Sequence, residues 1–261
     1  MSPQHFLVER RAHVAVVTLN RPGRANAVTY EVLRELEEIA LAFREDAETR
    51  AVVFTGARPH FCSGMDLKDA SGYGDSLVIR RRRTRIGARA MTALMDMDQI
   101  TIAAWTGAAM GGGACFATAL DFRIGATDCF MQYPEVDIGM NLMWQSLPLC
   151  VHLVGPARAK RLVVGGERIH GPTLAAWGVL DECVPVEDVL PRALAMAAFY
   201  AGKPPVAAQM IKRSINRISA ALDGAIMHMD ADQNLYNRTM QDQAEAIEAY
   251  LAKREPKFTG D

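Results

Sequence analysis

The chain of 261 residues is long enough for one large core with a smaller appended region. Hydrophobic residues make up 50% of it, and the formal net charge of -1 gives no overall attraction to nucleic acid or to an anionic membrane. Its 5 cysteines include no Cys-x-x-Cys pair, and the N-terminus lacks the apolar segment of a secretory signal. These features favour reduced thiols in the cytoplasm over a disulfide framework or a zinc site.

The N-terminal part of the chain predicts strands and one helix. Residues 6–9 and 14–19 predict two strands joined by a polar turn. Residues 29–44 predict a helix, because apolar residues recur there at helical spacing, and residues 51–55 predict a short buried strand. A strand, a helix and a second strand at this separation imply a right-handed crossover in a largely parallel sheet.

The segment 100–120 carries no charge and is long enough to cross a bilayer. Its glycines, at 107 and 111–113, argue against a spanning helix, because each costs about 1 kcal/mol relative to alanine. We predict a buried strand over residues 100–105, a turn, and a buried helix from 112 to 120. The glycines could expose backbone N–H groups to a ligand oxygen or simply allow close packing of strand and helix.

In the rest of the chain, the predicted secondary structure changes near residue 185 from mixed strands and helices to helices alone. Before it we predict a long helix at 76–97, strands at 121–124 and 128–131, helices at 146–164 and 173–177, and a strand at 181–184. After it we predict only helices, at 186–200, 205–218, 222–240 and 243–253. This pattern predicts an α/β core over residues 1–185, followed by a helical region over residues 186–261.

Four motifs in order resemble the enoyl-CoA hydratase/isomerase family, also called crotonases. They are LNRPGRANAVT at 19–29, HFCSGMDLKD at 60–69, GAAMGGGACFATALDFRIG at 107–125 and CFMQYPEVDIG at 129–139. The resemblance covers essentially the whole chain, and the ordered combination is more specific than any single motif. It implies a crotonase-like spiral of ββα units, a C-terminal helical region that forms trimers, and acyl-CoA thioesters as substrates.

The resemblance also implies three catalytic groups. By motif position, the backbone N–H groups of Met65 and Gly112 form an oxyanion hole, and Glu135 of the Pro-Glu motif is the acid/base. Two fixed donors stabilise the negative charge that a thioester oxygen gains when its α-carbon loses a proton, and losing one such donor costs roughly 3–4 kcal/mol. A carboxyl group in apolar surroundings has a raised pKa and exchanges protons near neutrality.

The chain departs from the family pattern at two places. Family hydratases have a second glutamate two residues after the glycine triplet, where this chain has Cys115. That thiol is either a buried small hydrophobe or, early in a helix, a thiolate nucleophile. Asp137 is a candidate second acid if its segment is extended. Trp144 ends a bulky Met-Asn-Leu-Met-Trp stretch that replaces a glycine-rich segment, and it either fills the acyl pocket or packs in the core.

Contacts to coenzyme A follow from the same resemblance. Arg24 and Lys68 match positions that contact the phosphates or pantetheine, and Tyr250 and Lys253 match an aromatic residue and a lysine near the adenine. Each of them could also be an ordinary solvated side chain. We expect homotrimers or hexamers, no metal, and no cofactor beyond the coenzyme A of the substrate. The arginines from Arg80 to Arg85 are interpreted as a solvated helix face, with CoA phosphates or RNA as alternatives.

The missing second glutamate shapes the functional prediction. Hydration needs a positioned water, which the family holds between two carboxylates, whereas a 1,3 proton shift needs only one base. We therefore predict an enolate-based reaction with Glu135 as the single acid/base, and favour double-bond isomerisation over hydration. The alternatives are a non-catalytic acyl-CoA- or RNA-binding member of the family, or an acyl-CoA hydrolase or decarboxylase that uses the same oxyanion hole.

Overall fold

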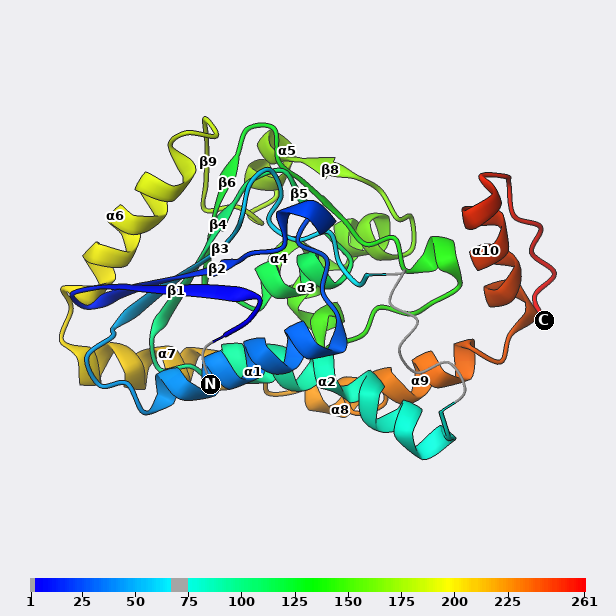
Figure 1. Ribbon diagram of the computed structural model, residues 1–261, viewed down its shortest axis with the longest axis horizontal. Helices are drawn as coiled ribbons and strands as arrows, with labels where there is room; N and C mark the ends of the chain where they lie inside the picture. The colour runs from blue at the N-terminus through cyan, green and yellow to red at the C-terminus, as the bar shows by residue number, and fades with distance from the viewer. Residues whose placement is uncertain (1–2, 67–74) are drawn as a thin grey trace.

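A computed structural model describes residues 3–66 and 75–261 of the chain (Figure 1). Strands and helices alternate through the first two thirds of the chain, and helices alone follow. The strands are β1 (Phe6–Arg11), β2 (Val14–Leu19), β3 (Ala51–Gly56), β4 (Ile100–Trp105), β5 (Ala108–Met110), β6 (Phe122–Ala126), β7 (Phe130–Gln132), β8 (Ile169–His170) and β9 (Glu182–Val184). The α-helices are α1 (Tyr30–Arg44), α2 (Leu77–Met95), α3 (Gly112–Thr118), α4 (Ser146–Val163), α5 (Gly171–Ala176), α6 (Val189–Ala201), α7 (Pro205–Ser219), α8 (Gly224–Met227), α9 (Asp230–Asn237) and α10 (Gln241–Ala252). Two short 3-10 turns, η1 (Pro22–Arg24) and η2 (Val136–Ile138), complete the described elements.

The larger sheet has six strands in the order β1-β2-β3-β4-β6-β9. The β1–β2 hairpin is antiparallel and every other pairing is parallel, which confirms the predicted largely parallel arrangement. Its central strands are buried on both faces, as is usual for parallel sheets, so they are runs of Val, Ile, Ala and Phe rather than alternating patterns. Helix α1 packs against α2, and Thr29 caps α1 by accepting the Val32 N–H at 3.3 Å.

A second sheet of three short strands, β5-β7-β8, builds the other side of the spiral. Cys62 forms a parallel bridge to Ala109 of β5, and β5 pairs in parallel with β7. Each turn of the chain therefore adds one strand to the large sheet and a shorter extended segment to the small one. This is the predicted spiral of ββα units. Strands β5 and β8 were not predicted, because two or three residues are too few to show a periodic pattern.

Segment 100–120 folds as the predicted strand, turn and helix: β4 is followed by β5 and then by α3, whose residues are all buried. Phe116 of α3 packs edge-on against Phe54 of β3, with ring centroids 5.6 Å apart, and tilted against Phe61 at 5.1 Å. These aromatic contacts fix α3 against the large sheet. No α-helix within residues 3–66 and 75–261 has both the length and the apolarity needed to cross a membrane.

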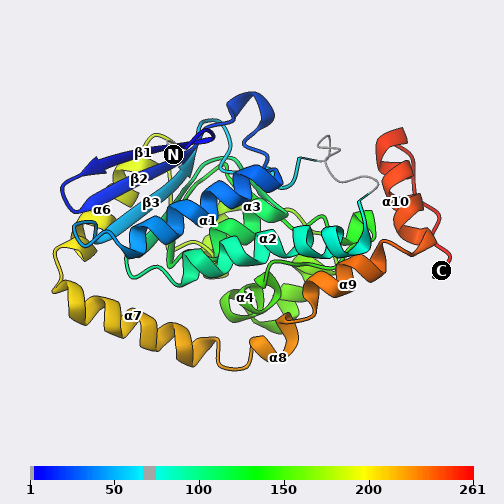
Figure 2. The same ribbon diagram turned by 60° about the horizontal axis from the view of Figure 1, so that its bottom comes forward.

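The C-terminal helices run along one edge of the molecule and end at α10, beside the C-terminus (Figures 1 and 2). Helix α6 packs against strands β2, β3, β4 and β6, so this first helix of the region after residue 185 covers the large sheet. The predicted single helix at 222–240 is wrong: the structure has α8 and α9, separated at His228 and Met229. The break brings the carboxylate of Asp230 onto the backbone of the 140–145 loop, a tertiary contact with no signal in the local pattern.

Candidate active site

Two backbone amides meet at the N-terminal end of α3. Gly111 precedes the helix with a φ of 48°, a left-handed conformation that favours glycine, and Gly112 is the first helical residue. A β-carbon placed on Gly64 would lie 3.4 Å from the nitrogen of Gly112, so the loop that carries Met65 reaches the start of α3. The fold therefore brings together two motifs that lie about fifty residues apart, at a point where helix N–H groups have no intrahelical partner.

A bridge between Val28 and Met65 determines the direction of the Met65 amide. The Val28 N–H donates to the Gly64 carbonyl at 2.8 Å, and the Asp66 N–H donates to the Val28 carbonyl at 2.9 Å. In parallel pairing these flanking groups face the partner strand, so the N–H of Met65 itself points away from Val28. Within the described part of the chain, neither the Met65 nor the Gly112 amide donates to a protein atom. Both are thus available to a ligand oxygen.

Glu135 reaches this point from β7 through the turn that begins η2. Its Oε1 lies 2.9 Å from the position of a β-carbon on Gly111, beside the first turn of α3. Oε2 is shielded from water and has no hydrogen-bond partner among the described residues. Burial, with a smaller effect of the nearby Asp137 charge, raises the pKa of Glu135 to about 7. The carboxyl group can therefore lose and regain a proton near neutral pH.

Cys115 lies one turn into α3 and is only 2% exposed. Its Sγ is 4.0 Å from the Met143 carbonyl, a weak contact. Burial raises the pKa of the Cys115 thiol well above its usual value, and the charge of Glu135 adds to the rise, while an interaction with Ser146 opposes it. The thiol is therefore protonated at neutral pH. The helix N-terminus does not outweigh the loss of hydration, and a thiolate nucleophile is not favoured at this position.

Asp137 follows Glu135 by two residues but lies in the 3-10 turn η2, not in an extended segment. The predicted condition for a shared face is therefore not met. Its carboxylate lies against Gly166, where a β-carbon would be 2.9 Å from Oδ2. Asp137 is exposed, and partial burial raises the pKa of its carboxyl group without bringing that group to Gly111. Among residues 3–66 and 75–261, the structure thus places one carboxylate beside Gly111, that of Glu135.

Trp144 completes the surroundings of Gly112. The residue is 6% exposed, and its ring lies where a β-carbon on Gly112 would be, 2.3 Å from Cζ3. The indole also covers Gly87 of α2, where a β-carbon would be 2.2 Å from Nε1. Consecutive glycines at the start of α3 therefore face two different groups: the Glu135 carboxylate beside Gly111 and the Trp144 indole beside Gly112.

The residues predicted to contact coenzyme A are spread over several elements. Arg24 ends η1, an exposed turn whose next residue, Ala25, accepts the Ser63 N–H at 3.2 Å. This places the Arg24 turn against the loop that leads to Met65. Lys68 lies outside the described residues. Tyr250 and Lys253 are exposed on and just after α10, which contacts η2, and no hydrogen bond within the described chain joins them to Arg24.

The predicted basic run on α2 is paired with acidic side chains at two of its five arginines, and among the described residues Arg80, Arg82 and Arg85 form no ion pair. Arg81 binds Asp232 of α9 at 2.6 Å, and Arg83 binds Asp75, just before α2, at 2.5 Å. The exposed Arg82 and Arg85 fit the interpretation as a solvated helix face, and surface pairs such as Arg81–Asp232 contribute little stability.

Two buried polar residues of the site were not predicted. Asn26 is fully buried and donates to the carbonyls of Ala57 and His60 at 2.7 and 2.6 Å, which ties the η1 turn to the loop after β3. Asp230 is 5% exposed and accepts the Gln145 N–H at 2.8 Å. Asn26 stands inside a family motif, which was a usable signal. Asp230 lies 95 positions after Glu135, and nothing in the sequence around it indicated a role in the site.

Comparison with known proteins agrees with this fold. The family model for enoyl-CoA hydratase/isomerase matches residues 9–261. Among curated proteins, crotonyl-CoA hydratase of Syntrophomonas wolfei is 28% identical over 260 residues, which cover 99% of this chain and 99% of that protein. Short-chain-enoyl-CoA hydratase of Clostridium acetobutylicum is 27% identical over 257 residues, which cover 97% of each chain.

Solved structures give the same result. An enoyl-CoA hydratase from Bacillus anthracis is 30% identical with a TM-score of 0.78, covering 99% of this chain and 100% of that one. A carnitinyl-CoA hydratase from Mycobacterium avium is 29% identical with a TM-score of 0.86, covering 99% of both chains. The chain belongs to the enoyl-CoA hydratase/isomerase family and has the crotonase fold. It is an enzyme of the class that acts on acyl-CoA thioesters.

Proposed function

We propose that this enzyme moves a double bond in an enoyl-CoA thioester, with Glu135 as its single acid/base and the Met65 and Gly112 amides as the oxyanion hole. The observation that carries the proposal is that Glu135 supplies the one carboxylate beside Gly111 among the described residues. The pKa of Glu135 is raised to about 7, and a neutral thiol at Cys115 stands in place of a second carboxylate. The described part of the site thus has one group that exchanges protons near neutrality, which is what a proton shift requires.

The chemistry is a two-step proton transfer. The Glu135 carboxylate takes a proton from the α-carbon of a β,γ-unsaturated thioester, and the electron pair moves onto the thioester oxygen as an extended enolate. The Met65 and Gly112 N–H groups donate to that oxygen and stabilise its charge. Protonated Glu135 then returns the proton to the γ-carbon, and the α,β-unsaturated thioester forms. Glu135 ends in its starting state, so no other reactant is consumed.

Hydration makes a further demand, which the described residues of the site do not meet. A water must be held for attack on the β-carbon while a proton is delivered to the α-carbon. Cys115, which is buried and protonated, is a weak hydrogen-bonding group and a poor substitute for a carboxylate. The proposal therefore ranks isomerisation above hydration.

The test compares two substrates with one enzyme. Vinylacetyl-CoA should be converted to crotonyl-CoA, which is measured by the absorbance of the conjugated thioester. Crotonyl-CoA should be hydrated slowly in the same assay. Hydration that is faster than isomerisation would contradict the proposal. Release of free coenzyme A, detected with a thiol reagent, would instead identify a hydrolase, and tight acyl-CoA binding without turnover would identify a non-catalytic family member.

Arg24 is proposed to contact the phosphates or pantetheine of coenzyme A, because its turn borders the Met65 loop. Arg24→Ala should raise KM about three- to tenfold with little change in kcat, because the contact is the same in the ground and transition states. Arg11→Ala is the matched control, since this exposed arginine lies at the opposite end of the β1–β2 hairpin. A fall in kcat at unchanged KM would refute the role of Arg24.

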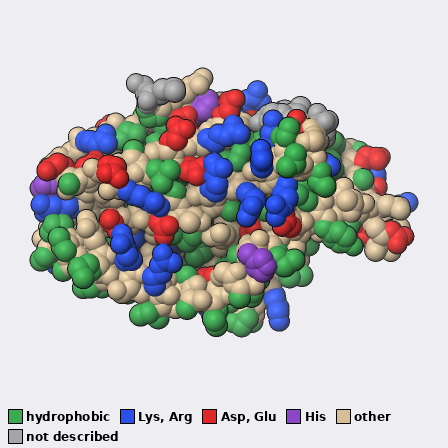
Figure 3. Space-filling model, turned by 90° about the horizontal axis from the view of Figure 1, so that it is seen from below, with side chains coloured by type: hydrophobic (Ala, Val, Ile, Leu, Met, Phe, Trp, Pro, Cys, Tyr) green, Lys and Arg blue, Asp and Glu red, His purple; other side chains and the backbone are tan. Residues whose placement is uncertain are grey.

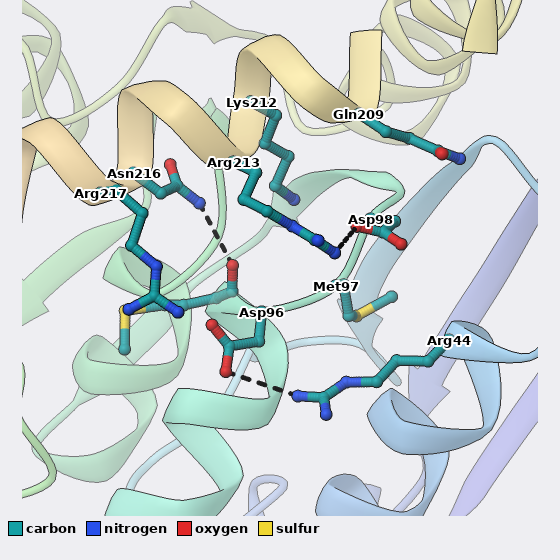
Figure 4. A pocket seen from close by; sticks show the side chains of 10 residues that line it. Arg44, Asp96, Met97, Asp98, Gln209, Lys212, Arg213, Asn216 and Arg217 are labelled. Carbon is teal, nitrogen blue, oxygen red and sulfur yellow. Dashed lines mark hydrogen bonds and ion pairs between the residues drawn. The ribbon is translucent and has the colours of Figure 1, made fainter. Parts of the chain in front are cut away.

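Self-assembly is proposed from the orientation of α7. The helix turns its polar side toward the body of the protein, where Arg213 binds Asp98 at 2.7 Å and Asn216 donates to the Met95 carbonyl at 3.2 Å (Figure 4). Lys212, the only buried residue of α7, donates to the Gln99 carbonyl at 2.6 Å. An amphipathic helix on the surface of a single-chain protein normally turns its apolar side toward the core and its polar side toward solvent.

The apolar side of α7 consequently faces outward, continuous with α8 along the edge seen from below in Figure 3. Its exposed side chains are Val206, Met210, Ile211, Ile215, Ile218, Leu222 and Ile226. A contiguous apolar strip of this kind marks a protein interface. We place subunit contacts of a homotrimer, or of trimers paired into hexamers, on this strip.

Ile215→Glu should therefore shift the particle mass toward the monomer in light scattering at micromolar concentration. Ile215 is 59% exposed, so a glutamate there does not disturb the core of an isolated chain. Val164→Glu is the matched control, because Val164 is 67% exposed at the end of α4 and lies outside the strip. A wild-type protein that is already monomeric would contradict the proposed assembly.

A further inference from the structure

Trp144 closes the space beside the amide of Gly112. The indole is wedged between the first turn of α3 and helix α2, and both helices have glycine where it touches them. A side chain at either Gly87 or Gly112 would overlap the ring, so these two positions form a slot that fits the indole. The slot begins one residue from Gly111, which faces the carboxylate of Glu135.

The backbone that holds Trp144 is unusual. Trp144 and the next residue, Gln145, have φ angles of 64° and 60°, a left-handed conformation that side-chain-bearing residues rarely adopt in succession. Such backbone persists only where surrounding contacts determine it. Here the N–H groups of both residues donate to the carboxylate of Asp230 in α9, that of Gln145 at 2.8 Å.

Asp230 is itself fixed by its surroundings. It is 5% exposed, and its own carbonyl accepts a hydrogen bond from the Asn141 side chain at 3.0 Å. A second contact holds the loop from the other side, where Thr92 Oγ1 of α2 lies 3.1 Å from Gln145 Oε1. The loop from Asn141 to Gln145 is therefore clamped between α2 and α9, and the ring has little freedom to leave its slot.

We propose that Trp144 is the end wall of the acyl pocket and that Asp230 is the positioning residue that keeps it there, so that the enzyme selects short-chain acyl-CoA thioesters. The inference rests on the proposed function, because it takes the Gly112 amide and Glu135 as the groups that hold the thioester. An acyl chain that extends beyond them meets the indole instead of open space. Replacing the indole with a small side chain opens the slot between Gly87 and Gly112 to further methylene groups.

The test measures binding of saturated acyl-CoAs, which cannot react at a double bond. Calorimetric affinities for butyryl-CoA and octanoyl-CoA give a chain-length ratio for each variant. In Trp144→Ala this ratio should shift in favour of octanoyl-CoA by at least about tenfold, since each newly buried methylene contributes about fourfold. Trp144→Phe should shift it less in the same direction. Trp177→Ala is the control, because that indole lies under Arg158 and Arg161 on α4.

Asp230→Asn tests the positioning role. It removes the charge that the two backbone N–H groups bind, so the ring should leave its slot part of the time and the chain-length ratio should move toward octanoyl-CoA. A purely structural role would lower stability without changing that ratio. If Trp144→Ala fails to fold, Trp144→Phe and Asp230→Asn still decide the outcome.

The possible failures are distinguishable. If the wild type binds neither coenzyme A nor butyryl-CoA, the proposed function itself is wrong. If all variants bind acyl-CoAs with a chain-length ratio within about twofold of the wild type, the acyl pocket does not end at Trp144 and this inference is overturned while the proposed function stands.

Discussion

Glu135→Gln should abolish turnover of enoyl-CoA substrates, lowering kcat by about a thousandfold while KM changes little. An amide of the same size preserves the shape of the site but cannot accept and return a proton, and general acid–base catalysis contributes factors of about 10²–10⁴. The loss falls on kcat because proton transfer occurs in the chemical step, not on binding. Initial rates over a range of substrate concentration measure both parameters.

Two variants serve as controls for this result. Asp137→Asn makes the same carboxylate-to-amide change two residues away, at the exposed group beside Gly166, and should retain most of the activity. Cys115→Ala should also retain most of it, because the protonated thiol does no proton transfer. An inactive Cys115→Ala beside an active Glu135→Gln would make the single-carboxylate mechanism untenable.

The wild-type pH profile adds an independent check. Glu135 must be ionised to remove a proton, so kcat/KM should rise with pH and level off above about 7, the raised pKa of Glu135. Because the Asp137 charge contributes to that rise, Asp137→Asn should move the midpoint slightly lower. A midpoint near the ordinary carboxyl value would mean that the buried carboxylate is not the titrating group.

Glu135→Gln should also stabilise the folded protein at alkaline pH. The pKa of Glu135 is raised from 4.5 to about 7 on folding, so between these values the folded state binds more protons than the unfolded state. Stability is then fully present below the unfolded pKa and is lost as pH rises through the folded pKa. At 1.36 kcal/mol per unit, the ionised carboxylate costs the folded state about 3 kcal/mol.

The measurement is urea unfolding at two pH values and one protein concentration, since assembly makes stability depend on concentration. At about pH 8 the variant should be more stable than the wild type by about 3 kcal/mol, and near pH 4.5 the difference should vanish. Asp137→Asn is the control, because the exposed Asp137 carboxylate has a much smaller desolvation cost. A difference that is independent of pH would mean that burial does not control the ionisation of Glu135.

Together these predictions describe a site in which the requirements of catalysis and of stability conflict. A carboxylate buried without a hydrogen-bond partner for Oε2 is costly to fold around, and the same burial gives it a pKa suited to proton transfer at neutral pH. Replacing it with an amide should raise stability and remove activity, the trade expected where a reactive group is kept in an unfavourable environment.

The sequence by itself determined the class of fold and predicted where the chemistry takes place. Strands such as β4 and helices such as α1 can be predicted from the hydrophobic pattern. A strand buried on both faces is a continuous apolar run, and a helix buried on one face has apolar residues at helical spacing. The ordered motifs predicted Met65, Gly112 and Glu135 as catalytic residues, and the resemblance implies that Cys115 replaces a glutamate of the family.

Only the tertiary structure decided which groups meet and in which ionisation state. The pKa of Glu135 depends on its burial against α3, and the protonated state of Cys115 depends on the apolar surroundings of its thiol. The outward turn of the apolar side of α7 and the clamp of Asp230 on Trp144 and Gln145 likewise depend on contacts between distant segments. Desolvation and long-range packing are properties of the folded surroundings, and the local sequence pattern does not encode them.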